Sequence, residues 1–191
     1  YKSLFGKIGM GLEYLFNRSG PISMAPSQLG VFAKSDPSLD DPNLQYHIQP
    51  LSLDAFGEPL HTFSAITASV CNLQPDSRGT VTIRSPHTDD KPVIKPNYLS
   101  SQTDKDIAAK SITLTRNIFA TEAMRKYEPT EFLPGAEHQS PKALAEQAGN
   151  ISTSIFHPVG TAKMGTGKDA VVDRELNFYG IQGLRVVDAS I

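Results

Sequence analysis

The chain has 191 residues, 39% of them hydrophobic and 20% charged, and its formal net charge is −2. This composition is typical of a folded protein, and the small net charge provides no basic surface for nucleic acid or anionic lipid. No run reaches the roughly 20 apolar residues that cross a bilayer, so we expect no membrane span. Cys71 is the only cysteine and can form no disulfide within the chain, which favours a cytoplasmic location.

The histidines give no indication of a metal site, because no two of them have the close spacing of zinc ligands. Three of them lie near clusters of turn-forming residues, and we expect these three to be solvated: His61, His87 and His138.

The first segment has apolar residues at helical spacing, which predicts a helix over residues 2–18. Three interior glycines interrupt it, and each costs a helix about 1 kcal/mol relative to alanine. The helix should end near Gly20-Pro21. The glycines do not have the spacing of a dinucleotide-binding turn, so we do not assign them to phosphate binding.

The next segment consists of short extended runs separated by clusters of Pro, Gly, Asp and Asn. The alternation of apolar and polar residues is clearest over residues 80–84. Strands joined by short turns leave no room for parallel crossovers, so we predict an antiparallel sheet. Its strands should lie within 30–35, 44–53, 61–75, 80–85 and 91–99.

Two helices and one strand are predicted after this sheet. The first helix should span residues 101–126 with Thr103 as its cap, and the second should span 140–147 with Ser140 as its cap. The apolar run 184–188 is typical of a strand that is buried on both faces. The fold class is therefore α+β, an antiparallel sheet flanked by helices, with a terminal strand that completes a sheet outside this chain.

His157 is the sharpest candidate for chemistry, because it lies between the apolar pair Ile155-Phe156 and Pro158. An imidazole that is partly removed from water tends to stay neutral and can accept a proton, as a general base must. Phe156 is a candidate for the wall of the same pocket. From the residues alone, the alternative is a structural histidine that hydrogen-bonds within the fold.

Two further pairs give weaker indications. Tyr46 and His47 occupy a predicted strand and could line a substrate pocket, although an exposed or core-edge position is the more common reason for such residues. Asp188 and Ala189 follow an apolar run, as ligand-binding residues do at the carboxyl ends of strands in open α/β sheets. An ordinary turn also begins in this way.

Several motifs follow one another near the end of the chain: His157–Thr161 (H-P-V-G-T), Met164-Gly165, Val171–Asp173, Tyr179-Gly180 and Gly183–Ile191. Together and in this order they resemble the carboxyl-terminal signature of the glucose-methanol-choline (GMC) oxidoreductases. Two earlier stretches, 71–79 and 96–99, are similar to the substrate domain of the same family. The resemblance extends from about residue 20 to the end of the chain.

The resemblance implies an FAD enzyme that removes a hydride from an alcohol carbon and delivers it to flavin N5, giving an aldehyde or ketone. His157 matches the histidine of the H-P-V-G-T motif and would act as the base toward the substrate hydroxyl. Asp188 and Ala189 would lie against the flavin. Residues 1–165 would form the substrate-binding domain and 166–191 a return segment of the FAD-binding domain.

The chain departs from the family pattern in two respects. It contains no G-x-G-x-x-G turn, so we expect its partner to be an amino-terminal FAD-binding part of the same polypeptide. In the family a second His or Asn follows the Ser-Ile dipeptide, and Ile191 is the last residue here. We therefore expect that the chain by itself neither retains FAD nor turns over. Two alternatives stay open: a cyanohydrin-cleaving flavin lyase of the same family, and a non-catalytic β-rich interaction module.

Overall fold

The computed structural model describes residues 3–55 and 57–191. The start of the first predicted helix, at Lys2, lies outside the described residues. The helical elements are α1 (Leu4–Asn17), the 3-10 helix η1 (Pro21–Ser23), α2 (Gln102–Phe119), α3 (Glu122–Arg125) and α4 (Pro141–Ile151). The strands are β1 (Leu29–Ala33), β2 (Leu44–Gln49), β3 (Thr67–Asn72), β4 (Thr80–Thr82) and β5 (Val93–Lys95).

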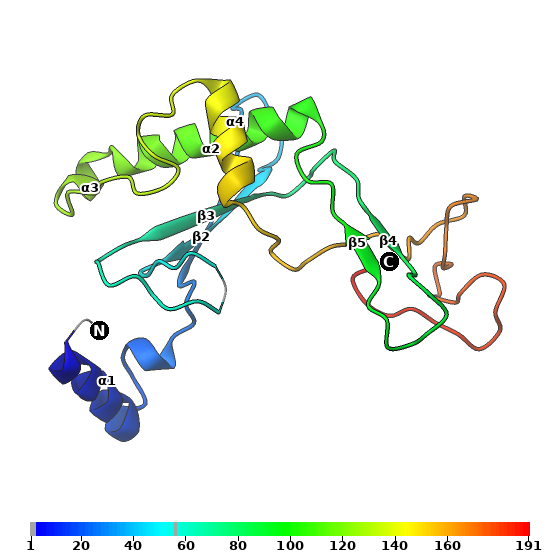
Figure 1. The fold of residues 1–191 in the computed structure, drawn as a ribbon, viewed down its shortest axis with the longest axis horizontal. Coiled ribbons are helices and arrows are strands. Elements are labelled where there is room, and N and C mark those ends of the chain that lie inside the picture. The colour runs from blue at the N-terminus through cyan, green and yellow to red at the C-terminus, as the bar shows by residue number, and fades with distance from the viewer. Residues whose placement is uncertain (1–2, 56) are drawn as a thin grey trace.

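The strands form two antiparallel sheets where the sequence predicted one. The larger has the order β1-β2-β3, and the smaller is the hairpin β4-β5. The helices lie beside these antiparallel strands (Figure 1), which confirms the α+β prediction. Gly79 explains the tight start of the hairpin, because a Cβ there would lie 2.3 Å from the carbonyl oxygen of Lys95.

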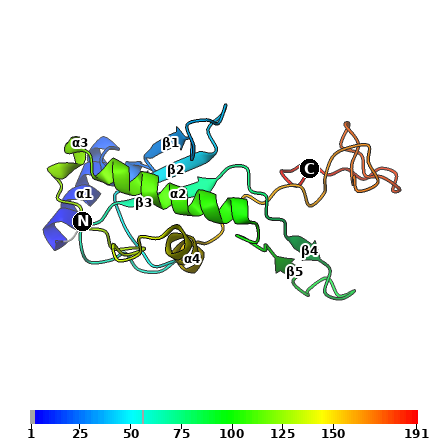
Figure 2. The ribbon, with the colours of Figure 1, turned by 90° about the horizontal axis from the view of Figure 1, so that it is seen from above.

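The core lies between the larger sheet and α2, which runs across one face of that sheet, and α4 packs against α2 (Figures 1 and 2). Tyr46 and Leu44 of β2 are almost completely buried on this face, as are Leu144 of α4 and Ala109 of α2. The Tyr46 hydroxyl donates to the Ser111 carbonyl oxygen at 3.2 Å and accepts from Thr115 Oγ1 at 3.2 Å. The sheet and α2 are therefore joined by both apolar contact and hydrogen bonds.

The start of α2 differs from the prediction. Ser101, not Thr103, is the cap, because the Ser101 backbone is extended and its Oγ accepts the N–H of Asp104 at 3.0 Å. The helix also ends earlier, at Phe119, because Thr121 is extended and begins the separate helix α3. The predicted cap of α4 is confirmed, since Ser140 Oγ accepts the N–H of Ala143.

Asp104, in the first turn of α2, joins three parts of the chain. Its carboxylate accepts from Asn72 Nδ2 at the end of β3, and from the N–H groups of Asp76 and Ser77 in the β3–β4 connection, at 2.8–3.1 Å. Burial alone would raise the pKa of Asp104, but the hydrogen bonds from Ser77 and Asp76 outweigh it and lower the pKa. The carboxylate is therefore held in its charged form.

Figure 2 shows that the molecule is elongated, with the β4-β5 hairpin and the carboxyl-terminal segment extending from one end of the body.

The predicted strand 184–188 does not form, and Arg185 makes only an isolated bridge with Asn177. Leu184 and Val187 stay exposed. The N–H of Phe178 donates to the Leu184 carbonyl oxygen and that of Val186 donates to the Leu176 carbonyl oxygen, but the pairing is limited to this one bridge and is too short for a strand. Within the described residues, no helix is long and apolar enough to cross a membrane.

Replacing Asp104 should destabilise the fold. We expect Asp104→Ala to lower the free energy of unfolding by about 3 kcal/mol, because it leaves several buried donors without an acceptor. The lowered pKa means that the stabilisation is present above the ordinary value of 3.8 and is lost as the pH falls through the lowered pKa. Urea unfolding of the two proteins at pH 7 and at pH 3 should therefore show a difference that shrinks at the lower pH. The control is Asp106→Ala, an exposed position that accepts from Gln102; an equal effect of both substitutions would contradict the prediction.

Removing the Tyr46 hydroxyl should have a smaller effect. Tyr46→Phe keeps the buried ring and removes one hydrogen-bonded hydroxyl, so we expect a loss of about 1 kcal/mol in the free energy of unfolding. Tyr98→Phe is the matched control, because the Tyr98 hydroxyl meets Ser154 at the surface. Urea unfolding that ranks Tyr98→Phe as the more damaging change would show that Tyr46 does not join the sheet to α2.

Candidate functional site

The loop that carries His157 connects α4 to the carboxyl-terminal segment. It runs irregularly after Ser152, the residue that ends α4, and the N–H of Phe156 donates to Ser154 Oγ at 2.9 Å. His157 is exposed, and so is Phe156, at 67%. Ile155 is exposed as well, at 40%, so the expectation that this apolar stretch is sheltered is wrong for the chain by itself.

The segment that follows, residues 161–191, is a small unit held by its own backbone. Val172 is its core and is fully buried, between bridges to Met164 and Phe178. The N–H of Ala162 donates to the Ser190 carbonyl oxygen at 2.8 Å, and that of Met164 donates to the Ile191 carbonyl oxygen at 2.8 Å. The end of the chain is thereby fixed beside residues that directly follow the H-P-V-G-T motif. This unit includes residues on both sides of the boundary predicted at 165/166.

Asp188 and Ala189 form an exposed turn at the end of this unit. The Asp188 carboxylate accepts from the hydroxyl and the N–H of Ser190, and these two hydrogen bonds lower the pKa of Asp188. The side chain is thus used to shape its own turn. The turn presents backbone and the 72% exposed side chain of Val187 to the outside. Such a surface fits one edge of a flat cofactor but does not enclose it.

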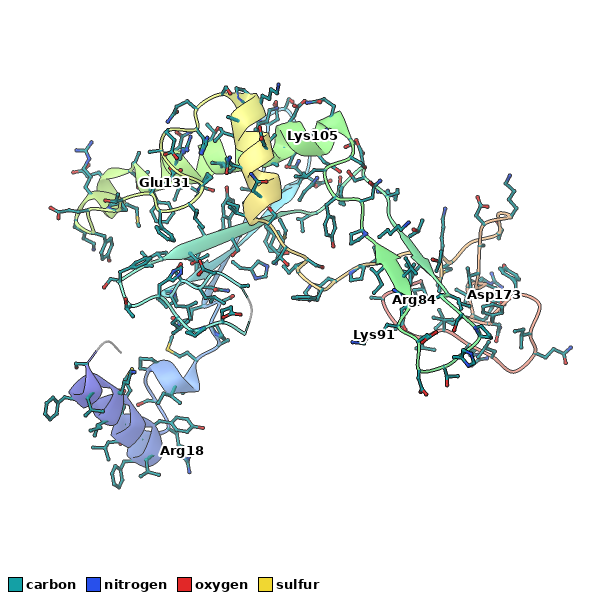
Figure 3. The ribbon with its side chains drawn as sticks, in the orientation of Figure 1. Arg18, Arg84, Lys91, Lys105, Glu131 and Asp173 are labelled. Carbon is teal, nitrogen blue, oxygen red and sulfur yellow. The ribbon has the colours of Figure 1, made fainter. Side chains whose placement is uncertain are left out.

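A second feature of this unit could not be assigned from sequence. A depression of about 540 Å³ is lined by residues that include Met164, Asp173 and Tyr179, and Figure 3 shows Asp173 at this end of the molecule. Hydrogen bonds from Asn177 outweigh desolvation and lower the pKa of Asp173. The Tyr179 hydroxyl donates to the Gly165 carbonyl oxygen at 2.9 Å. These polar groups therefore hold the turns of the unit together.

Tyr46 and His47 point to opposite faces of the larger sheet. Tyr46 is in the core against α2, which corrects its prediction as a pocket residue: a side chain enclosed by a helix of the same domain is closed to substrate. His47, opposite Gly30 and Ser69, is on the other face. Its Nε2 is shielded from solvent, and no described group is within hydrogen-bonding distance. A buried polar atom without a partner indicates a site that another group completes.

His61, predicted to be solvated, instead makes hydrogen bonds and a ring contact within the β2–β3 loop. Its Nδ1 lies 3.0 Å from Ser52 Oγ and its Nε2 lies 3.1 Å from Asp54 Oδ1, and its ring stacks on Phe63. These residue types also occur in hydrolase triads. Here Asp54 is exposed at the surface, with 77% of its side chain accessible, and the arrangement serves to close the loop.

The structure therefore joins the His157 loop to the Asp188 turn through residues 161–165, whereas His47 comes from a separate element. No described group of three or more His, Cys, Asp or Glu side chains could hold a metal ion.

Comparison with known proteins agrees with the motifs. A family model described as GMC oxidoreductase matches residues 75–191. An alcohol dehydrogenase (acceptor) from Pseudomonas putida is 36% identical over 186 residues, which are 97% of this chain and 34% of the relative. An oxygen-dependent choline dehydrogenase from Brucella anthropi is 37% identical over 191 residues, 99% of this chain and 35% of the relative.

Solved structures share the fold. A pyridoxine 4-oxidase from Mesorbium loti matches with a TM-score of 0.77 and 27% identity, over 88% of this chain and 34% of that one. A variant of the Aspergillus oryzae formate oxidase, studied for its FAD modification, matches with a TM-score of 0.83 and 22% identity, over 97% and 37%. The chain spans about a third of the length of these proteins. Since the family model covers more than half of it, the chain belongs to the GMC oxidoreductase family.

Proposed function

We propose that this chain is the substrate-binding portion of an FAD-dependent oxidoreductase that oxidises an alcohol to an aldehyde or ketone, with His157 as the base. The observation that carries the proposal is the pair of backbone hydrogen bonds that fix residues 190 and 191 beside residues 162 and 164. These bonds join the residues that follow His157, the proposed proton acceptor, to the residues that follow Asp188 and Ala189, the proposed cofactor edge. A hydride transfer needs both groups at one substrate carbon.

FAD, when bound, supplies the hydride acceptor at N5. The residues of this chain would contribute at one edge only, where Asp188 shapes the turn and Ala189 and Val187 are exposed beside it. The remainder of the FAD site would come from the amino-terminal part of the polypeptide. We expect for this reason that the chain alone does not retain FAD. A purified chain 1–191 with bound flavin would contradict this.

His157 would take the proton of the substrate hydroxyl. Loss of this proton makes hydride departure from the neighbouring carbon easier, and a neutral imidazole is the form that can accept it. Desolvation favours the neutral form of histidine. His157 is exposed in this chain, so the FAD-binding part would have to cover the loop. The second His or Asn of the catalytic pair would lie after Ile191 in the polypeptide.

The names of the relatives support an alcohol as the substrate, because they describe alcohol and choline dehydrogenases. His47 and Phe156 are the proposed pocket residues of this chain. Of these, His47 has the more specific support, since its enclosed Nε2 lacks a partner that a substrate oxygen could provide.

His157→Asn in the full-length protein tests the role of the base. We expect anaerobic reduction of the flavin by alcohol to slow by roughly 10²–10⁴-fold, the usual contribution of a general base, with flavin content unchanged. Stopped-flow absorbance of the flavin measures both. His87→Asn, an exposed histidine in the β4-β5 hairpin region, is the control and should reduce at the normal rate.

The same measurement separates the alternatives. A lyase should leave the flavin oxidised in the presence of any alcohol tested. If alcohol reduces the flavin of the folded His157→Asn protein at the normal rate, His157 is not the base, and a structural role for this histidine is favoured.

His47→Leu tests the pocket wall. If a substrate oxygen hydrogen-bonds to His47 Nε2, removal of the imidazole should lower kcat/KM for the alcohol about tenfold, the effect of one lost hydrogen bond. Tyr46→Phe, one residue away on the opposite face, should leave kcat/KM unchanged. Steady-state kinetics in which both substitutions leave kcat/KM unchanged would remove His47 from the proposed site.

A further inference from the structure

Helix α1 has its apolar side turned away from the rest of the chain. No side chain from Leu4 to Asn17 is buried. Among the described helices and strands, η1 is the one that α1 contacts substantially. Figure 1 shows α1 apart from the sheet and from α2 and α4. A surface helix of a folded domain normally turns its apolar side toward the core. The orientation of α1 therefore requires an explanation.

The exposed apolar side chains form one continuous stripe. Successive residues of a helix are rotated by about 100°, so the six side chains fall within an arc of about 120°. They are 49–85% exposed, and we call them the α1 stripe: Leu4, Phe5, Ile8, Leu12, Leu15 and Phe16. Met10, which lies on the opposite side, is the more sheltered apolar residue. The pattern is that of an amphipathic helix whose partner is outside the described chain.

Gly9 and Gly11 flank the stripe on either side. A Cβ at either position would meet no described atom within 4 Å, so nothing in this chain requires glycine there. Each glycine nevertheless costs the helix about 1 kcal/mol relative to alanine. Glycines beside an apolar stripe permit the close approach of another surface.

The total exposed surface indicates how large the covering partner must be. The chain has an accessible surface of 14237 Å² at a mass of 20.7 kDa, whereas a compact monomer of that mass exposes roughly 9,000 Å². The excess of roughly 5,000 Å² is several times the 800 Å² or so that each subunit contributes to a standard interface. One ordinary contact with a second copy would leave most of it uncovered.

The relatives indicate which partner has this size. They match 97–99% of this chain, so that the match includes α1, and the chain makes up only about a third of their length. A partner in the same polypeptide is also present at high effective concentration. A membrane surface is less suited, because the polar side of α1 carries Lys7 and Glu13, Arg18 is its C-cap, and the helix has no cluster of basic residues.

We propose that the α1 stripe is a docking surface for the flavin-binding part of the same polypeptide, which meets it with an apolar surface and closely approaches Gly9 and Gly11. This docking proposal rests on the proposed function in one respect: it assumes that the covering part of the polypeptide is the part that binds flavin. The α1 helix would then hold the two parts together at a place remote from the carboxyl-terminal segment, which lies toward the other end of the molecule (Figure 1).

Thiol accessibility in the full-length protein tests the proposal. Leu12→Cys and Ile8→Cys place a thiol in the stripe, and Tyr14→Cys places one on the polar side of the same helix. Trypsin cuts after Lys7 and Arg18, so all three thiols are read by mass in one peptide, 8–18. In the native protein we expect maleimide to modify the two stripe positions at least about tenfold more slowly than position 14, and in urea to modify all three at one rate.

Other outcomes overturn the proposal. Equal rates at all three positions in the native protein would show that the stripe is uncovered. Slow modification seen only with phosphatidylserine vesicles would assign it to a membrane, and slow modification seen only at protein concentrations that give dimers would assign it to a second copy. Flavin reduction by alcohol, measured on the same samples, keeps the two proposals apart. A protected stripe without alcohol oxidation overturns the proposed function alone, and alcohol oxidation with an unprotected stripe overturns the docking alone.

Discussion

The carboxylate of Asp104 is the interaction on which the arrangement of this chain depends. It joins the first turn of α2 to the end of β3 and to the connection that leads into the β4-β5 hairpin. Ser77 reinforces the junction, because its Oγ accepts the N–H groups of Ser100 and Ser101 just before the helix. A charged group that is buried must be satisfied by several donors, and here those donors belong to the segments whose relative position it sets. The sheet, α2 and the connection to the hairpin therefore meet at one polar point, from which the β4-β5 hairpin extends.

The parts of the fold that depend on local sequence could be predicted from it. Helical spacing gave α1 and α2, the Ser140-Pro141 pair gave the start of α4, and the turn clusters separated the strands correctly. The errors arose where distant contacts decide. Ser101 rather than Thr103 caps α2 because Ser77 and Asp104 hold the chain there. The break of the sheet after β3 follows from the same junction, which redirects the chain before β4 begins.

The candidate site shows the same division between local and distant information. The H-P-V-G-T motif and the Asp188 turn could be found because they are contiguous motifs, whereas the proximity of residues 162–164 to 190–191 appears only in the structure. Tyr46 and His47 were equivalent in sequence. Strand alternation places them on opposite faces, and only the position of α2 shows that Tyr46 is the core residue and His47 the one with an unsatisfied ring nitrogen.

Three features that would be defects in a complete domain are consistent with one another if the chain is covered by another part of the polypeptide. The α1 stripe packs on no core, Leu184 and Val187 of the run 184–188 are exposed, and His157 lacks the shelter that a general base needs. The first two lie at opposite ends of an elongated molecule, so a partner that satisfied both would extend along its length, past the loop that carries His157. If the proposed function holds, this chain would supply the proton acceptor, His157, and the flavin-binding part would shield that histidine from water. The base would then become effective only when the part that accepts the hydride is in place.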